Sequence, residues 1–203
     1  MAETDFFEQI KLFLPKYLTP AQTAELFSEL SKFPENMSFY LSHSAWQDEL
    51  LQGDGWHGFV AINFESGERR SVAGMVISNS CDIFPGNVRD LPINVLFSPL
   101  IEVSRLVERL RAGGKESGPI ADMMAGVRKQ RVTQMFYLPE YSGVWSESVV
   151  LLDNIHAHPL QHFLTSTRRK LFTLTQYAFY LFLMKLSIHL SRFQEDVQRF
   201  DGP

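Results

Sequence analysis

The amino-acid sequence predicts an α+β fold, namely a small β-barrel with α-helices at both ends of the chain. Three observations carry this prediction. Apolar residues recur at helical spacing in the first fifty residues, strand patterns separated by turns begin near residue 56, and a strongly apolar helical pattern returns near the C-terminus. A chain of 203 residues has room for one ordinary domain with helical additions. We therefore expect an N-terminal helical extension (1–52), a barrel (53–165) with a helical insertion near 101–131, and a C-terminal helix (166–203).

Helical patterns dominate the N-terminal extension. A first helix, ended by Pro15, is predicted by apolar residues that share one face: Phe6, Phe7, Ile10, Phe13 and Leu14. Thr19 followed by Pro20 has the form of an N-cap and a first-turn proline. A second helix is therefore predicted to begin there and to end before Pro34.

The expected barrel consists of short strands bounded by turn residues. Five strands are predicted, at residues 59–62, 72–78, 93–97, 133–138 and 148–153. The first two are expected to form a hairpin around the polar turn at Gly67. Between the strands, helical spacing of apolar residues predicts helices at 101–112 and 120–131. From about Pro159 onward the pattern is helical, with a break near 165–167.

Composition excludes several classes of protein. With 45% hydrophobic and 21% charged residues, the chain is neither disordered nor a coiled coil. Its net charge of −4 gives no whole-surface attraction to nucleic acid or to an anionic membrane. One cysteine, Cys81, and a start without a secretory signal predict a reducing, cytoplasmic location. The longest apolar run, residues 177–184, is too short to span a bilayer, so no membrane partner is expected.

Five short segments form an ordered series between residues 53 and 165: GD at 53–54, FESGERR at 64–70, GMVISN at 74–79, VLFSPLI at 95–101 and SVVLLDNI at 148–155. In this order they resemble the SH3-like barrel of the MazF/PemK toxin superfamily. The resemblance implies an SH3-like barrel and a place in a prokaryotic toxin–antitoxin or phage-defence type system. It also implies a ribonuclease ancestry, although a shared fold does not carry chemistry with it.

The chain departs from this family at its catalytic positions. The family's ribonucleases place Arg-Pro at the start of the second strand, where this chain has residues 72–74, Val-Ala-Gly. The catalytic Thr or Ser that follows Pro-Ile in the family is replaced by Ile101 or Glu102. The lost arginine favours a non-catalytic or weakly catalytic interaction subunit of such a system.

The alternative is a diverged endoribonuclease that cleaves single-stranded RNA without a metal. In that case Arg69 or Arg70 would stabilise charge on the phosphate, and Ser78 or Ser80 would assist. Neither reading calls for a cofactor.

Two further polar clusters are weighed as sites. Cys81 is expected to pack as a small apolar residue with a structural role, because the charge of Asp82 opposes thiolate formation. Asn79 and Asp82 are expected to hydrogen-bond within a turn. Three histidines are spaced as candidate metal ligands: His156, His158 and His162. Three imidazoles alone leave a zinc site open, so no metal is predicted.

The partners expected from the sequence are RNA and protein. Two basic runs are candidates for contact with RNA: Arg128, Lys129 and Arg131, and Arg168, Arg169 and Lys170. Aromatic residues suited to base stacking lie near the first run: Tyr137, Tyr141 and Trp145. The alternative for these basic residues is a role at helix ends, where they complement the helix dipole.

The C-terminal helix is apolar on almost every side. We expect it to bury part of that surface, including Phe179 and Phe182, against a second copy or a partner protein. Its polar residues fall on a single stripe that is predicted to face solvent, with a charged docking strip as the alternative: Lys185, His189, Arg192, Asp196 and Arg199.

Overall fold

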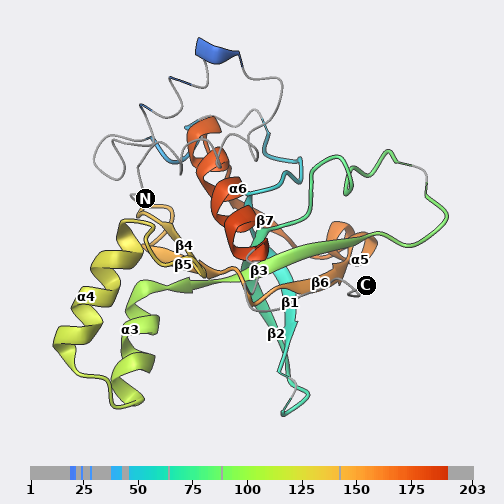
Figure 1. Cartoon of the computed structure of the whole chain (residues 1–203). Coiled ribbons are helices and arrows are strands. Elements are labelled where there is room, and N and C mark those ends of the chain that lie inside the picture. The colour runs from blue at the N-terminus through green and yellow to red at the C-terminus, as the bar shows by residue number, and fades with distance from the viewer. Residues whose placement is uncertain are drawn as a thin grey trace, which may run out of the picture.

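The computed structural model describes residues 19–21, 24, 28, 38–42, 46–63, 65–87, 89–141 and 143–191. Strands and helices follow one another along the chain, which confirms the α+β class (Figure 1). The elements are β1 (Gly55–Ile62), β2 (Arg69–Val76), β3 (Asn94–Glu102), α3 (Val103–Ala112), α4 (Ser117–Arg128), β4 (Met135–Leu138), β5 (Ser148–Leu151), β6 (His156–Pro159), α5 (Leu160–Thr165), β7 (Arg169–Phe172) and α6 (Gln176–Leu190). The first predicted N-terminal helix lies outside the described residues, and of the second Pro20, Ala21, Ala24 and Ser28 are helical.

The strands of the described residues form one antiparallel sheet that does not close on itself. The strand order is β4-β5-β3-β2-β1-β7, and β6 pairs with β3 off this path. Within the described part of the chain no pairing joins the end strands β4 and β7. The sheet is therefore open, and the closed barrel expected from the sequence is not formed. The predicted hairpin is confirmed, since β1 and β2 pair from Gly55↔Met75 to Ile62↔Arg69.

Strand β3 is the centre of the sheet and is longer than predicted. It pairs with β2 at one edge, and its other edge pairs with β6 over Asn94–Phe97 and with β5 over Leu100–Glu102. The helix predicted from residue 101 therefore begins only at Val103. Partners from β5 hold residues 100–102 in the strand conformation, although their apolar spacing also fits a helix.

Strand β7 lies where the sequence predicts helix. Its residues pair with β1, with Lys170 opposite Trp56 and Arg169 opposite His57. The prediction of an unbroken C-terminal helix over 166–203 is therefore wrong at Arg169–Phe172, and α6 begins only at Gln176. The pairing partner lies more than a hundred residues earlier in the chain, and local spacing carries no signal of it.

A column of stacked rings fills the core beneath the sheet. Phe59 lies between Phe163 and Phe97, at ring-centroid distances of 4.3 and 4.1 Å, and His156 stacks on Phe97 at 5.4 Å. Gly74 lies against this column. A Cβ at Gly74 would be 2.6 Å from Phe97 Cδ2 and 2.8 Å from Phe59 Cδ2, so the stack requires a residue without a side chain there.

Helix α6 crosses the sheet and is largely covered by its own chain (Figure 1). Phe182 is fully buried, and the centre of its ring lies 5.4 Å from the centre of the Phe136 ring. Phe179 is partly buried in the same core cluster. Phe182 therefore belongs to the core of this chain, which corrects its expected place on a contact surface. Among the described residues, no helix has both the length and the apolar character needed to cross a membrane.

Lys185 of α6, predicted to lie on a solvent-facing stripe, is buried instead. Its ammonium donates to the Gln130 carbonyl at 2.9 Å, to Gln130 Oε1 at 3.1 Å and to the Val132 carbonyl at 2.8 Å. Burial lowers the pKa of Lys185 to about 8. Arg192, Asp196 and Arg199 of that stripe lie outside the described residues.

Gln130 connects α6 to the outer edge of β4. Its side-chain amide donates to the Tyr137 carbonyl at 2.7 Å and accepts from the Tyr137 N–H at 3.0 Å, as a neighbouring strand would. Gln130 adopts a left-handed backbone conformation with φ of 57°. The amide and Lys185 together cover an edge that would otherwise be open to another strand.

We predict that Gly74→Ala lowers the free energy of unfolding by about 1–3 kcal/mol, because the added methyl group overlaps two rings that are buried in the core. Urea denaturation followed by circular dichroism measures this change.

Gly126→Ala is the matched control for this prediction. Gly126 lies in α4, and the nearest atom to an added Cβ is Val132 Cγ2 at 3.9 Å. This variant is expected to gain about 0.5–1 kcal/mol from helix propensity. Equal stability changes in the two variants would contradict a rigid ring column.

Candidate functional site

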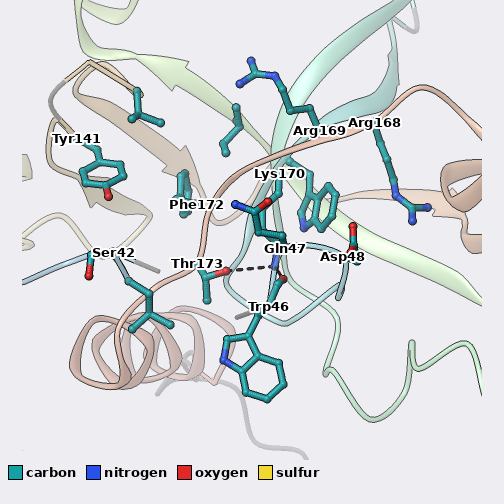
Figure 2. Close-up of a pocket in the computed structure, with 14 residues that line it drawn as sticks. Ser42, Trp46, Gln47, Asp48, Tyr141, Arg168, Arg169, Lys170, Phe172 and Thr173 are labelled. Carbon is teal, nitrogen blue, oxygen red and sulfur yellow. Dashed lines mark hydrogen bonds between the residues drawn. The ribbon is translucent and has the colours of Figure 1, made fainter. Parts of the chain in front are cut away.

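The strongest candidate site is a groove of about 670 Å³ along β7, here named the β7 groove (Figure 2). Basic and aromatic side chains gather in it. Its lining consists of Leu41, Ser42, Trp46, Gln47, Asp48, Trp56, Tyr141, Val144 and the six residues from Arg168 to Thr173. The groove thus contains the second basic run predicted from the sequence.

Arg168, just before β7, and Arg169, its first residue, point in different directions (Figure 2). Arg168 donates through Nη1 to the Leu164 carbonyl at 2.7 Å, and its guanidinium lies over the Trp56 ring at 5.7 Å. Arg169 is exposed, and within the described residues it has no carboxylate within ion-pair distance. Arg169 is therefore the cation of the groove with the most freedom to bind an anion.

Lys170 is engaged on every side. Its Nζ lies 2.7 Å from Asp54 Oδ2 and 3.2 Å from Thr173 Oγ1, and it also donates to the Trp46 carbonyl. The ammonium lies 5.1 Å from the centre of the Trp56 ring. Because the Lys170 side chain is 11% exposed and Asp54 is 1% exposed, this is a buried ion pair. Lys170 therefore stabilises the wall of the groove, and its charge contributes little to the attraction of a ligand.

Asp54 lies at the entrance to β1 and its carboxylate is almost completely buried. Besides Lys170, Oδ2 accepts from the Leu51 N–H at 3.1 Å. Burial raises the pKa of Asp54 to about 6, and the charge and hydrogen bond of Lys170 oppose that rise only in part. The desolvation of the carboxylate thus outweighs its attraction to Lys170.

The aromatic walls differ in what they offer to a ligand. Trp46 is 45% exposed and Tyr141 is half-buried, so both can be reached from the groove. Trp56 is 3% exposed and is covered by the two cations described above. Asp48 brings one carboxylate to the rim. The groove can therefore hold an anionic group near Arg169 and a flat ring against Trp46 or Tyr141.

The first basic run lies elsewhere, at the end of α4 (Figure 1). Arg128 is bound to Glu147 through Nη2 at 2.7 Å and Nε at 3.1 Å. Lys129 and Arg131 are exposed. The aromatic residues predicted near this run are divided: Tyr137 is buried with its hydroxyl 3.2 Å from Glu147 Oε2, and Tyr141 lines the β7 groove instead.

The four residues expected of a ribonuclease are not brought together. Arg69 and Arg70 begin β2, and Arg70 pairs with Glu68 at 2.8 Å on the exposed hairpin. Ser78 and Ser80 follow the other end of β2. Six extended residue steps separate Arg70 from that end of the strand, which corresponds to about 20 Å. Both hydroxyls accept backbone hydrogen bonds, from the Leu96 N–H at 2.7 Å and from the Gln52 N–H at 2.8 Å respectively.

Around Cys81 the expected turn is present in part. The Cys81 N–H donates to Asn79 Oδ1 at 2.9 Å, as expected of an asparagine turn. Asp82 binds Arg89 at 3.1 Å rather than the turn backbone. Cys81 itself is exposed, not packed as a small apolar residue.

The three histidines lie on β6 and α5. His158 is buried, its ring centre is 5.0 Å from that of His162, and burial lowers the pKa of His158. His156 stacks on Phe97 and its Nε2 lies 3.1 Å from Asn154 Oδ1. Among the residues described, no three His, Cys, Asp or Glu side chains are grouped as metal ligands.

Three features of this site were not predicted from the sequence: Trp46, Asp54 and the strand that carries Lys170. The sequence does contain a signal for that strand, because β-branched Thr167, Thr173 and Thr175 flank it. Nothing local indicates that Asp54 pairs with a residue so far along the chain.

No protein-family model matches this chain, and no curated protein matches it.

We predict that breaking the buried ion pair destabilises the protein. Asp54→Ala and Lys170→Met should each lower the free energy of unfolding by about 3–5 kcal/mol, because each leaves an unpaired buried charge. The double variant should recover most of that loss, since neither charge remains. Urea denaturation of the four proteins gives the coupling energy.

The exposed Glu68–Arg70 pair is the control, and Glu68→Ala should leave stability nearly unchanged. Additive losses in the Asp54→Ala/Lys170→Met double variant would contradict a coupled pair.

A second prediction concerns pH. The pKa of Asp54 is raised to about 6 in the folded protein from an ordinary value of 3.8, so the folded state binds this proton more tightly. The resulting stabilisation is present below about pH 4 and is lost as the pH rises through 6. The stability of the wild type relative to Asp54→Asn should therefore fall across pH 4–6. Parallel stability curves for the two proteins would show that Asp54 does not titrate there.

Proposed function

We propose that this chain is a non-catalytic binding subunit that holds single-stranded RNA in the β7 groove. The observation that carries the proposal is the meeting of Arg168 and Arg169 with Trp46 and Tyr141 in one groove. Sequence-tolerant binding of single strands uses this combination, in which cations follow the phosphates and aromatic rings stack on the bases. Double-stranded nucleic acid offers no unstacked base to these rings.

The charge of the groove sets how strongly salt opposes binding. Lys170 is neutralised by Asp54, so two guanidinium groups remain for phosphate contacts. Each phosphate contact on a single strand contributes about −0.7 to the slope of log affinity against log salt concentration, which gives a slope of about −1.4. Asp48 at the rim disfavours further phosphates.

The wider role is an interaction subunit of a prokaryotic toxin–antitoxin or phage-defence type system with an SH3-like core. Its support is the ordered resemblance to the MazF/PemK superfamily. Self-association or partner binding through the partly buried face of α6 is part of this proposal, with Phe179 as the accessible ring. The ribonuclease alternative draws no support from the separated positions of Arg70 and Ser78.

Fluorescence anisotropy with a labelled single-stranded oligoribonucleotide of mixed sequence tests the RNA site. Wild type should bind with a salt slope of about −1.4, and Arg169→Ala should bind more weakly with a slope of about −0.7. The oligonucleotide should remain intact after incubation.

The Lys129→Ala/Arg131→Ala variant is the matched control, because it removes two exposed charges outside the groove. Equal losses in the two variants would contradict the proposed location. Cleavage of the RNA that Arg70→Ala abolishes would favour the ribonuclease instead.

A further inference from the structure

A second cavity, of about 540 Å³, lies beside the β7 groove and shares Asp48 with it. Its character is different, because its apolar lining comes from Leu50, Leu51, Leu164 and Phe84. Leu50 belongs to the core cluster that contains Phe59, and Leu164 packs against that cluster. Leu50 and Leu164 therefore join the cavity to the packed core, while Phe84 has 56% of its surface exposed.

The exposed ring of Phe84 is held in place by its own loop. A Cβ at Gly86 would be 2.5 Å from Phe84 Cε1, so the ring lies directly over the Gly86 backbone. The Asn87 N–H donates to the Phe84 carbonyl at 3.1 Å, and Asn87 Nδ2 donates to the Cys81 carbonyl at 2.5 Å. A ring that rests on the backbone of a hydrogen-bonded loop loses less conformational entropy on binding than an unsupported one.

Two carboxylate side chains also line the cavity. Asp48 and Glu49 are exposed at its rim, and among the described residues neither has a basic side chain within ion-pair distance. This negative rim repels nucleic acid and anionic lipid, and it complements a cationic partner. The chemistry is thus opposite to that of the β7 groove.

We propose that this cavity docks a short peptide segment of a partner protein, in which an apolar side chain is flanked by lysine or arginine. The apolar side chain packs between Phe84 and Leu164, and the flanking cations face Asp48 and Glu49. An apolar or aromatic anchor in a well-packed pocket, surrounded by contacts that exclude water, is a common form of binding hot spot. This surface shares Asp48 with the proposed RNA site, but the proposal does not rest on RNA binding there.

The single cysteine of the chain supplies a direct measure of occupancy. Cys81 lines the cavity and is exposed, so a docked peptide should slow its alkylation by iodoacetamide. Two capped pentapeptides serve as probes, Lys-Leu-Phe-Leu-Lys and Glu-Leu-Phe-Leu-Glu. The basic peptide should protect Cys81 and bind at least tenfold more tightly than the acidic one, as measured by calorimetry.

Three variants locate the binding. Phe84→Ser should weaken the basic peptide at least tenfold without changing RNA affinity, and Asp48→Asn/Glu49→Gln should remove the preference for the basic peptide. Leu91→Ser is the control, because Leu91 is an exposed apolar residue outside the cavity lining, and it should have no effect.

Several outcomes would overturn the proposal. They are equal binding of the two peptides, unchanged Cys81 alkylation, or a loss in Leu91→Ser equal to that in Phe84→Ser. A dimer in light scattering that depends on Phe84, with neither peptide bound, would assign the cavity to a second copy of this chain. Loss of RNA binding alone would leave this proposal standing and would contradict only the function proposed for the groove.

Discussion

The Asp54–Lys170 ion pair joins the parts of this protein that form its candidate site. Lys170 reaches the carboxylate at the start of β1, the Thr173 hydroxyl and the Trp46 carbonyl, so one ammonium ties β7 to β1 and to the segment that carries Trp46. The raised pKa of Asp54 means that desolvation exceeds the attraction between the two charges. We infer that the ion pair fixes the register of β7 against β1 rather than adding net stability to the fold. Strand β7 has only four residues, and its pairing with β1 shifts register between Gly55 and Trp56, so it needs such a constraint.

The outer edges of the two end strands, β4 and β7, are protected from pairing with another strand in different ways. At β4, the Gln130 amide forms the two backbone hydrogen bonds that a neighbouring strand would otherwise form with Tyr137. Lys185 of α6 holds Gln130 in position by donating a hydrogen bond to its carbonyl. At β7, the strand is short and carries the exposed charge of Arg169, which opposes pairing with another sheet. Arg169 therefore both opposes pairing at this edge and contributes positive charge to the β7 groove. Protection of the edge and binding of an anion are compatible uses of the same residue.

Two neighbouring surfaces of opposite charge follow from this arrangement. The segment of residues 46–51 contributes Trp46 to the basic groove and Leu50 to the apolar cavity, with Asp48 at both. A chain with a net charge of −4 can still present a local basic groove, because a ligand responds to the field near its binding site. Arg70 lies near the start of β2 and Ser78 follows its other end, so the residues expected of a ribonuclease are not adjacent in this structure.

The sequence by itself determined the α+β class, the β1–β2 hairpin and the presence of α3 and α4 within about three residues of their bounds, because each depends on residues that are neighbours in the chain. It also singled out Arg168, Arg169 and Lys170, since a basic run is visible without any structure. Only the tertiary structure decided that the sheet stays open, that Lys185 and Phe182 are buried, and that Lys170 is paired while Arg169 has no ion-pair partner among the described residues. The open sheet and the burial of Lys170 depend on β7 meeting β1, a contact between residues more than a hundred positions apart. Such contacts are selected by packing and desolvation over the whole chain, and local periodicity does not record them.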